Sequence, residues 1–331
     1  MKPARDSIFQ RRLLVVAGKG GVGKTSIASA LGWAAAQLGK RTLLVEVDGA
    51  GRAAHLLGVE PAPLGTAQPV NESLSVMSVE GSTALAEYLR IILPVKRVLE
   101  AVFTSRIYQY FVAAAPGLKE LMTIGKIWYE AERRDEHGRR CWDIVIMDAP
   151  ATGHSLQYLR MPRAAHEAFG DGLVRRESQL LIDLLTDPER CAVNLVTTAE
   201  EMPVNETIEM YQLIVNELHL PLGCLFVNRT HHAHFHVKDV DRLARSVAKV
   251  RNPDERALIE EVVNRGREEV GWSEIHQRYV QRLADEVSMP LIEVPFMFAD
   301  EFGAAQVRGI AEELPARLSL LARRGHRHGR S

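Results

Sequence analysis

Cysteine is scarce in this 331-residue sequence, and the placement of its three cysteines excludes several classes of protein. Cys141, Cys191 and Cys224 lie far apart and form no C-x-x-C pair, so neither a disulfide scaffold nor a local zinc clip is predicted. Long apolar runs are also missing, since no stretch reaches the roughly 18 uninterrupted apolar residues that span a bilayer. The run from Leu13 to Ala17 is too short for a signal-peptide core. We expect a cytoplasmic protein without stable membrane insertion.

The sequence also lacks an excess of charge of one sign. Its formal net charge is −1, so no general attraction to nucleic acid is predicted. The clear local excess is basic and lies in residues 323–331, which we expect to be a flexible tail. Internal repeats and low-complexity segments are absent from the sequence, and a single phosphate loop is present. A machine with two nucleotide sites therefore requires two copies of the chain.

Short apolar runs recur along the chain, separated by longer segments of helical spacing. The runs are Leu13 to Val16, Thr42 to Val47, Leu74 to Val79, Ile144 to Met147, Ala192 to Val196, Cys224 to Val227 and Leu291 to Val294. Continuous runs of this length are typical of strands that crossover helices bury on both faces. The sequence therefore predicts an α/β fold with a doubly wound, mostly parallel sheet.

Two helical regions exceed what simple crossovers require. They cover about residues 85–136 and 163–186, and because they flank one strand we expect them to form one inserted helical subdomain. The second region is predicted to be one helix from Arg163 to Leu185.

A further charged helical insertion is predicted over about residues 239–286. Breaks are expected in it around Asn252-Pro253 and at Gly271. We expect residues 10–322 to form a single domain that includes both helical additions.

The segment GKGGVGKT, from Gly18 to Thr25, matches the phosphate-loop pattern G-x-x-x-x-G-K-[ST] and has the required strand before it and helix after it. Its glycines allow the backbone N–H groups to surround a phosphate. Lys24 is expected to contact the β and γ phosphates, and Thr25 to ligate magnesium. The predicted nucleotide contacts here are Gly18, Lys19, Gly20, Gly21, Val22, Gly23, Lys24, Thr25 and Ser26. ATP and Mg²⁺ are the predicted cofactors.

Lys19 is a second lysine within this loop. One loop has no evident need for two lysines on its own phosphates, so Lys19 is a candidate to reach the phosphates of a second copy of the chain. The alternative is a solvated lysine that attracts phosphate without a specific contact.

Two aspartates end predicted strands, at the edge of the sheet where ligands bind in such folds. Asp48 is a candidate to orient or deprotonate the attacking water and to lie near the metal, with a helix cap as the alternative role. Glu46 ranks below it. Asp148 ends the run Val145 to Met147, an arrangement that holds magnesium in phosphate-loop ATPases.

Three other features carry more open predictions. The small-residue loop Ala149 to His154 is expected to respond to loss of the γ phosphate, and His154 is either a general base or, as we favour, a structural histidine. Asn228 follows a predicted strand and can pair with both donor and acceptor edges of adenine, or can serve as a turn residue. Metal binding by the cluster His231, His232, His234 and His236 is not favoured, because neither cysteines nor carboxylates lie close by in the sequence.

Four segments in order resemble the ArsA-type ATPases, the family of the arsenite-pump ATPase and of the eukaryotic ATPase that delivers tail-anchored membrane proteins. These are the deviant Walker A loop with Lys19, DAPATGHSLQYLRMP from Asp148, PGLKEL from Pro116 and TTAEEMPVNET from Thr197. The resemblance covers about residues 10–322. It implies a homodimer in which Lys19 crosses to the partner's phosphates and Asp48 is the catalytic aspartate. It also implies nucleotide contacts at Glu200, Asn228, Pro295 and Phe296.

The sequence departs from this family at several positions. Gly49 follows Asp48 where the family usually has proline, which leaves the geometry of that loop open. The zinc-binding C-x-x-C of the targeting ATPases and the clustered cysteines of arsenite pumps are both missing, so neither a zinc-held dimer nor arsenite transport is expected.

The resemblance also raises the question of a protein client. In the targeting ATPases the helical subdomain forms an apolar groove for transmembrane helices. Here the apolar residues of that region either pack in a core, the usual role of such a stripe, or line a groove for a client with an apolar helix. They are Leu93, Val98, Leu99, Val102, Phe103, Ile107, Tyr108, Phe111 and Leu118.

The leading hypothesis is an ATPase in which hydrolysis drives a change of shape in a homodimer. A partition or septum-positioning ATPase is the alternative, disfavoured because neither a basic DNA-binding stripe nor a basic terminal amphipathic helix is evident. A nucleotide-gated interaction module remains open. An iron-sulfur reductase is disfavoured by the cysteine pattern.

Overall fold

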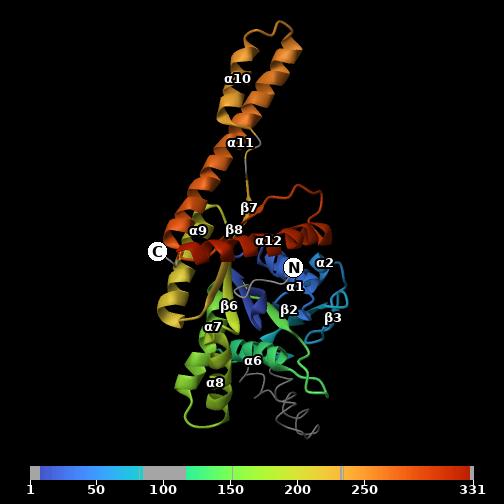
Figure 1. Ribbon diagram of the computed structural model, residues 1–331, viewed down its shortest axis with the longest axis vertical. Helices are drawn as coiled ribbons and strands as arrows, with labels where there is room; N and C mark the ends of the chain where they lie inside the picture. Colours follow the sequence, from blue (N-terminus) through green and yellow to red (C-terminus); the bar gives the residue numbers. More distant parts are fainter. Residues whose placement is uncertain are drawn as a thin grey trace, which may run out of the picture.

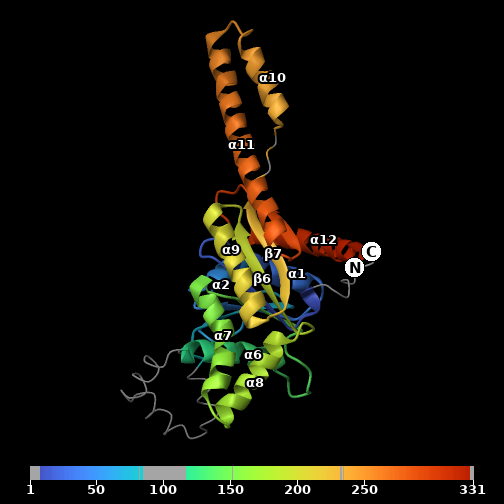
Figure 2. The ribbon, with the colours of Figure 1, turned by 90° about the vertical axis from the view of Figure 1, so that its left-hand side faces the viewer.

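The computed structural model describes residues 8–81, 83–84, 117–150, 152–231, 233 and 235–328. The predictions made for residues 85–116, for His232 and His234 and for residues 329–331 lie outside these ranges. The described part of the chain has one sheet as its centre, flanked by helices, with a helical hairpin extending from it (Figures 1 and 2).

The described strands form one eight-stranded sheet with the order β3-β4-β2-β5-β1-β6-β7-β8. All neighbours are parallel except β3 and β4. The bounds are β1 Leu13–Gly18, β2 Thr42–Val47, β3 Gln68–Pro69, β4 Leu74–Val79, β5 Ile144–Asp148, β6 Cys191–Thr198, β7 Leu222–Thr230 and β8 Leu291–Pro295. The predicted α/β fold with a doubly wound, mostly parallel sheet is confirmed, and each apolar run of strand length is a strand.

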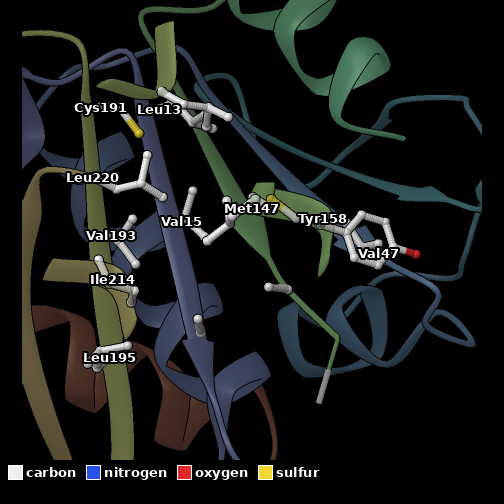
Figure 3. Close-up of a cluster of buried hydrophobic side chains, with 14 of the residues drawn as sticks. Leu13, Val15, Val47, Met147, Tyr158, Cys191, Val193, Leu195, Ile214 and Leu220 are labelled. Atoms are coloured by element: carbon white, nitrogen blue, oxygen red, sulfur yellow. The ribbon is translucent and has the colours of Figure 1, made fainter. Parts of the chain in front are cut away.

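Alternate residues of the strands face two different helical layers, because side chains in a strand alternate between its faces. Leu14 and Val16 of β1 belong to a buried cluster that includes residues of the helices α1, α2 and α12. Leu13 and Val15 belong to a second cluster, with residues of α6, α7, α8 and α9 (Figure 3). The helices are α1 Lys24–Gln37, α2 Arg52–Leu57, α6 Leu118–Glu132, α7 Thr152–Ala168, α8 Leu173–Thr186, α9 Glu201–Leu213 and α12 Ala304–His328. The continuous apolar runs are thus explained by burial on both faces.

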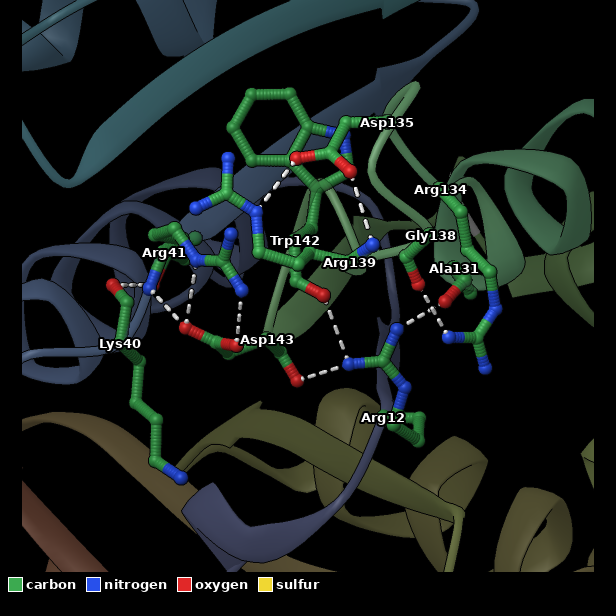
Figure 4. Close-up of polar contacts among 11 residues, drawn as sticks. Arg12, Lys40, Arg41, Ala131, Arg134, Asp135, Gly138, Arg139, Trp142 and Asp143 are labelled. Atoms are coloured by element: carbon green, nitrogen blue, oxygen red, sulfur yellow. Dashed lines mark hydrogen bonds and ion pairs between the residues drawn. The ribbon is translucent and has the colours of Figure 1, made fainter.

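A buried arginine links several elements at the end of the sheet where the parallel strands begin. The guanidinium of Arg12 donates to the main-chain carbonyls of Ala131, Trp142 and Asp143, which connects the start of β1 to the end of α6 and the start of β5 (Figure 4). Beside it, Asp143 accepts hydrogen bonds from the backbone and the guanidinium of Arg41. Polar contacts therefore hold together the end of the sheet where the strands begin. The phosphate loop lies at the opposite end, where the strands terminate.

The helix predicted from Arg163 to Leu185 is wrong in its bounds, because the chain forms two helices there. The first, α7, begins at Thr152 and continues through Pro162, and a break that contains Gly170 and Gly172 separates it from α8. The two glycines lower the helix propensity of that segment enough to allow a turn. The apolar sides of α6, α7 and α8 lie in the same cluster as the strands. The inserted subdomain as a whole stays a prediction, because residues 85–116 are outside the described ranges.

The charged insertion forms a helical hairpin, which we call the arm, of α10 Val237–Val247 and α11 Pro253–Glu286. The predicted break at Asn252-Pro253 is confirmed, and the Asn252 side chain caps α11 by accepting from the Asp254 N–H at 2.9 Å. The predicted break at Gly271 is wrong. One glycine costs a helix only about 1 kcal/mol, which 34 residues of continuous helix readily offset.

The last described helix, α12, continues to His328, so residues 323–328 have helical backbone where a flexible tail was expected. None of the helices in the described ranges has both the length and the apolar character that crossing a bilayer requires.

Candidate functional site

The phosphate loop lies between β1 and α1, at the edge of the sheet where the strands end. Gly18, Gly21 and Gly23 have φ angles of 154°, 84° and 91°, values that side-chain-bearing residues rarely adopt. A β carbon on Gly18 would also lie 2.2 Å from the carbonyl oxygen of Val196 in β6. Glycine is therefore required here by conformation and by space, as a loop that surrounds a phosphate demands.

Lys24 is buried at the start of α1, and its ammonium group donates to the carbonyl oxygen of Lys19 at 2.9 Å. The loop is thus held in a curve by its own lysine. Burial lowers the pKa of Lys24, and the nearby carboxylate of Asp148 opposes that change. A desolvated cation inside a glycine-rich loop is suited to bind phosphate oxygens.

Asp148 ends β5 beside this lysine, with its residue only 4% exposed. Burial raises its pKa to about 7, against the opposing effects of a hydrogen bond from the Thr25 hydroxyl and of the Lys24 charge. Its Oδ1 atom has no hydrogen-bond partner among the described residues. A buried carboxylate oxygen without a partner, beside a hydroxyl, is the hard oxygen environment that magnesium prefers, so Thr25 and Asp148 fit this ion.

Asp48 follows β2 and adopts a left-handed backbone conformation with φ 52°. Its N–H donates to the carbonyl of Val79 at 2.9 Å, and its carboxylate accepts a hydrogen bond from the hydroxyl of Tyr158 on α7. Asp48 is exposed, so its carboxylate is also open to solvent. Burial, together with the hydrogen bond to Asp48, raises the pKa of Tyr158, so the phenol remains a donor.

Glu46 has a different role from Asp48. Its buried carboxylate accepts from the N–H groups of Gly51 at 3.0 Å and Ala53 at 3.2 Å, and from the Ser78 hydroxyl at 3.0 Å. A β carbon on Gly49 would lie 2.2 Å from this carboxyl group. Glycine at residue 49, where the family usually has proline, therefore leaves room for the buried Glu46 carboxylate. That carboxylate supports the loop and the start of α2.

Lys19 points to α9, where its ammonium group forms an ion pair with Glu206. The two side chains are 24% and 32% exposed, so the pair is partly accessible to solvent. The expected contact of Lys19 with a partner's phosphates stays a prediction, and it requires Lys19 to leave Glu206.

The amide nitrogen of Asn228, at the end of β7, donates to the carbonyl oxygen of Val22 in the phosphate loop at 2.9 Å. The neighbouring strand β8 ends at Pro295, and the Phe296 N–H donates to Thr230 of β7 at 3.0 Å. Glu200 is exposed and lies directly before α9. Asn228 and Pro295 thus lie on the neighbouring strands β7 and β8, Phe296 directly follows β8, and Glu200 lies two residues after β6.

Of the histidine cluster, His231 and His236 lie in the described ranges, and these ranges contain no group of three or more potential metal ligands. The His231 N–H donates to Nδ1 of His276 on α11 at 3.0 Å, and His231 Nε2 lies 3.8 Å from Glu269. His231 therefore joins the end of β7 to the base of the arm. The side-chain surroundings of His154 lie outside the description.

Sequence reasoning missed two residues that contact the predicted catalytic side chains, Tyr158 on Asp48 and Glu206 on Lys19. Both lie inside the segments that carry the family resemblance. They are 110 and 187 residues from their partners, so no local spacing indicates the contacts.

Known proteins resemble the chain across most of its length. A family model described as an anion-transporting ATPase matches residues 11–180. ATPase BagA of Mycobacterium tuberculosis is 29% identical over 303 residues, which cover 86% of this chain and 87% of BagA. An arsenical pump-driving ATPase of Acidiphilium multivorum is 28% identical over 216 residues, or 60% of this chain and 36% of that protein. ATPase get3 of Schizosaccharomyces japonicus is 26% identical over 170 residues, or 51% of this chain and 50% of that protein.

Proposed function

The chain belongs to the anion-transporting ATPase family of the ArsA type, and from this premise we propose that it is a magnesium-dependent ATPase that works as a homodimeric, ATP-driven switch. The observation that carries the proposal is the group Lys24, Thr25 and Asp148. It combines a desolvated cation, a hydroxyl and a buried carboxylate oxygen without a partner at the mouth of a phosphate loop. Magnesium held there would neutralise the charge that develops on the phosphates.

Within this proposal the neighbouring strands bind the rest of the nucleotide. Asn228 uses its amide nitrogen on Val22, which leaves its carbonyl oxygen for the exocyclic amine of adenine. Phe296 and Pro295 lie beside the base, and Glu200 contacts the nucleotide from the loop after β6.

Asp48 orients the attacking water, and Lys19 stabilises the developing charge on the partner's phosphates. The carboxylate of Asp48 is exposed at the edge of the sheet where the loop lies, and Lys19 is held by a partly exposed ion pair that can open. An ATPase that needs a lysine from its partner hydrolyses ATP only as a dimer.

Hydrolysis is coupled to shape through α7, which begins four residues after Asp148. Changes at the loop that follows Asp148 reach α8 and α6, because these helices pack on α7. We further propose that the helical region presents an apolar surface to a protein client with an apolar helix.

The proposal is tested by measuring ATP turnover per chain against protein concentration and magnesium, with the oligomeric state followed by light scattering in ATP and in ADP. Turnover that rises with concentration, requires magnesium and collapses in Lys19→Ala supports it. Lys249→Ala, on the exposed tip of the arm, is the matched control and should behave as wild type. Full turnover in both Lys19→Ala and Asp48→Ala would contradict the mechanism.

A further inference from the structure

A buried tyrosine on α7 contacts Asp48, the residue that follows β2. The hydroxyl of Tyr158 donates a hydrogen bond to Oδ2 of Asp48. The helix α6, which packs on α7, contains Thr123, whose hydroxyl donates to the carbonyl of Lys119 at 2.9 Å. The hydrogen bond of Tyr158 therefore connects α7 directly to the predicted catalytic aspartate.

The surroundings of Tyr158 fix the position of its hydroxyl. The residue is 4% exposed, and its ring belongs to the core cluster that includes Val47 and Met147, the residues before the two aspartates (Figure 3). Burial of a hydroxyl group that has no hydrogen-bond partner is energetically costly. The hydrogen bond to Asp48 therefore holds the Tyr158 hydroxyl in this position. A ring packed in this way allows few other positions for the hydroxyl.

Asp48 is held independently through its main chain. Its left-handed conformation is unfavourable for a residue with a β carbon, and the hydrogen bond of its N–H to Val79 at the end of β4 helps to maintain it. The main chain therefore fixes the position of the Asp48 Cβ atom, and the hydrogen bond from Tyr158 fixes the orientation of its carboxylate.

We propose that Tyr158 is a positioning residue for ATP hydrolysis, whose hydroxyl orients Asp48 and joins it to the helix α7. The inference rests on the proposed function, since it assigns to Tyr158 the control of the aspartate that orients water. It goes beyond that function by naming the contact through which the helical layer acts on the reaction. A carboxylate that points correctly before the substrate arrives lowers the barrier without strengthening substrate binding.

The packing of α6 on α7 explains how the helices reach this contact. Gly117, the residue before α6, has a φ of 83°, and a β carbon there would lie 2.1 Å from the sulfur of Met161 on α7. Met161 is one helical turn beyond Tyr158. A shift of α6 along α7 must therefore change the environment of Tyr158 and, through it, the orientation of Asp48.

The substitution Tyr158→Phe tests the inference because it removes the hydroxyl and keeps the ring. We expect kcat to fall about tenfold to hundredfold, the range for loss of a hydrogen bond to a charged group. KM and the affinity for ATP should change less than about twofold. Tyr211→Phe is the matched control, since Tyr211 packs on the same core and its hydroxyl has no hydrogen bond in the described part of the chain.

Asp48→Asn separates this inference from the proposed function. If Tyr158 acts through Asp48, Tyr158→Phe should slow single-turnover hydrolysis in the wild-type background and cause no further loss in the Asp48→Asn background. Wild-type kcat in Tyr158→Phe, or an equal loss in both backgrounds, would overturn the inference and leave the ATPase proposal standing. A lower melting temperature with weaker ATP binding would also overturn it, because it would show a purely structural role. Full turnover in Asp48→Asn would instead remove the catalytic role of Asp48, and the inference would fall with it.

Discussion

The side-chain amide of Asn228 occupies the space in front of Gly23, with its nitrogen 2.2 Å from the point where a β carbon would stand. The same nitrogen donates to Val22, so β7 supports the phosphate loop directly. Gly23 also has a left-handed φ of 91° and is the residue before α1. Gly23 thus gives the phosphate loop its left-handed conformation, precedes the first residue of α1 and contacts Asn228 of the neighbouring strand β7.

Gly23→Ala should therefore abolish binding of ATP while the chain remains folded. The β carbon must displace Asn228, and the left-handed conformation costs about 1 kcal/mol for alanine. Binding of a fluorescent ATP analogue and thermal unfolding would be measured together. Gly125→Ala is the control, because Gly125 lies within α6 with open space around it, and it should bind ATP normally and be as stable or more stable. Tight binding by Gly23→Ala would contradict the assigned role of this loop.

Glu206→Gln should make turnover possible at lower protein concentration. Loss of the ion pair frees Lys19 for a partner chain, and a partly exposed pair contributes about 0.2–1 kcal/mol. The protein concentration that gives half-maximal turnover should fall by up to about fivefold. The control is Glu209→Gln, an exposed carboxylate on the same helix. A higher half-maximal concentration would show that Glu206 supports Lys19 rather than withholding it.

Thiol labelling of the native protein should modify Cys141 alone. Burial raises the pKa of both Cys191 and Cys224 to about 12, so almost no thiolate forms at these positions at pH 8, whereas Cys141 is partly exposed. Titration with a chromogenic disulfide reagent should give one fast thiol in buffer and three in denaturant. Cys141→Ser should give none in buffer, and a fast second thiol would mean that the sheet opens locally.

The contact between Arg41 and Asp143 should make a pH-dependent contribution to stability. The hydrogen bonds and charge of Arg41 lower the pKa of Asp143 below its ordinary value of 3.8. A carboxylate whose pKa is lower in the folded state stabilises the fold above the unfolded pKa, and this contribution is lost as the pH falls through the folded pKa. Asp143→Asn should therefore reduce the free energy of unfolding by roughly 1 kcal/mol at pH 7, because the pair is partly exposed.

Denaturant unfolding of wild type and Asp143→Asn at pH 7 and near pH 2.5 would test this contribution. The difference between the two proteins should be smaller at the acidic pH, because part of the Asp143 carboxylate is then protonated in the folded state. Asp171→Asn, at a fully exposed carboxylate, should show no difference at either pH. If the difference in free energy of unfolding between wild type and Asp143→Asn were the same at both pH values, it would arise from altered packing or hydrogen bonding and not from the charge of Asp143.

The sheet and the phosphate loop could be predicted because their signals are local. An apolar run such as Ile144 to Met147 must be buried on both faces, and the glycine spacing from Gly18 to Gly23 requires a specific backbone path. The helix bounds around Pro162 and Gly271 could not be predicted in the same way. Packing of α7 on α6 and α8 outweighs the cost of Pro162, about 3 kcal/mol, and the length of α11 outweighs the cost of Gly271, about 1 kcal/mol.

The contacts of the candidate catalytic residues were beyond prediction for a different reason. Asp48 and Lys19 were identified from their places at a strand end and in a loop. Tyr158 and Glu206 become their neighbours only when α7 and α9 return across the same face of the sheet. The identity of a hydrogen-bonding partner more than 100 residues away depends on the helix rotation, which periodicity alone does not fix.

The length of the arm is structurally independent of the candidate ATP site. The crossover from β7 to β8 is completed by the inner end of α11, where Leu283 is fully buried in the main core and Arg282 bonds Asn205 on α9 at 2.8 Å. Farther out, α10 and α11 pack on each other through a small cluster of described residues around Val240 and Val263. Matched helical turns added to or removed from both helices would change the extension of the arm by about 5.4 Å each. The strand register and the phosphate loop would stay as they are, so relatives can differ in how far this arm extends without any change to the ATP site.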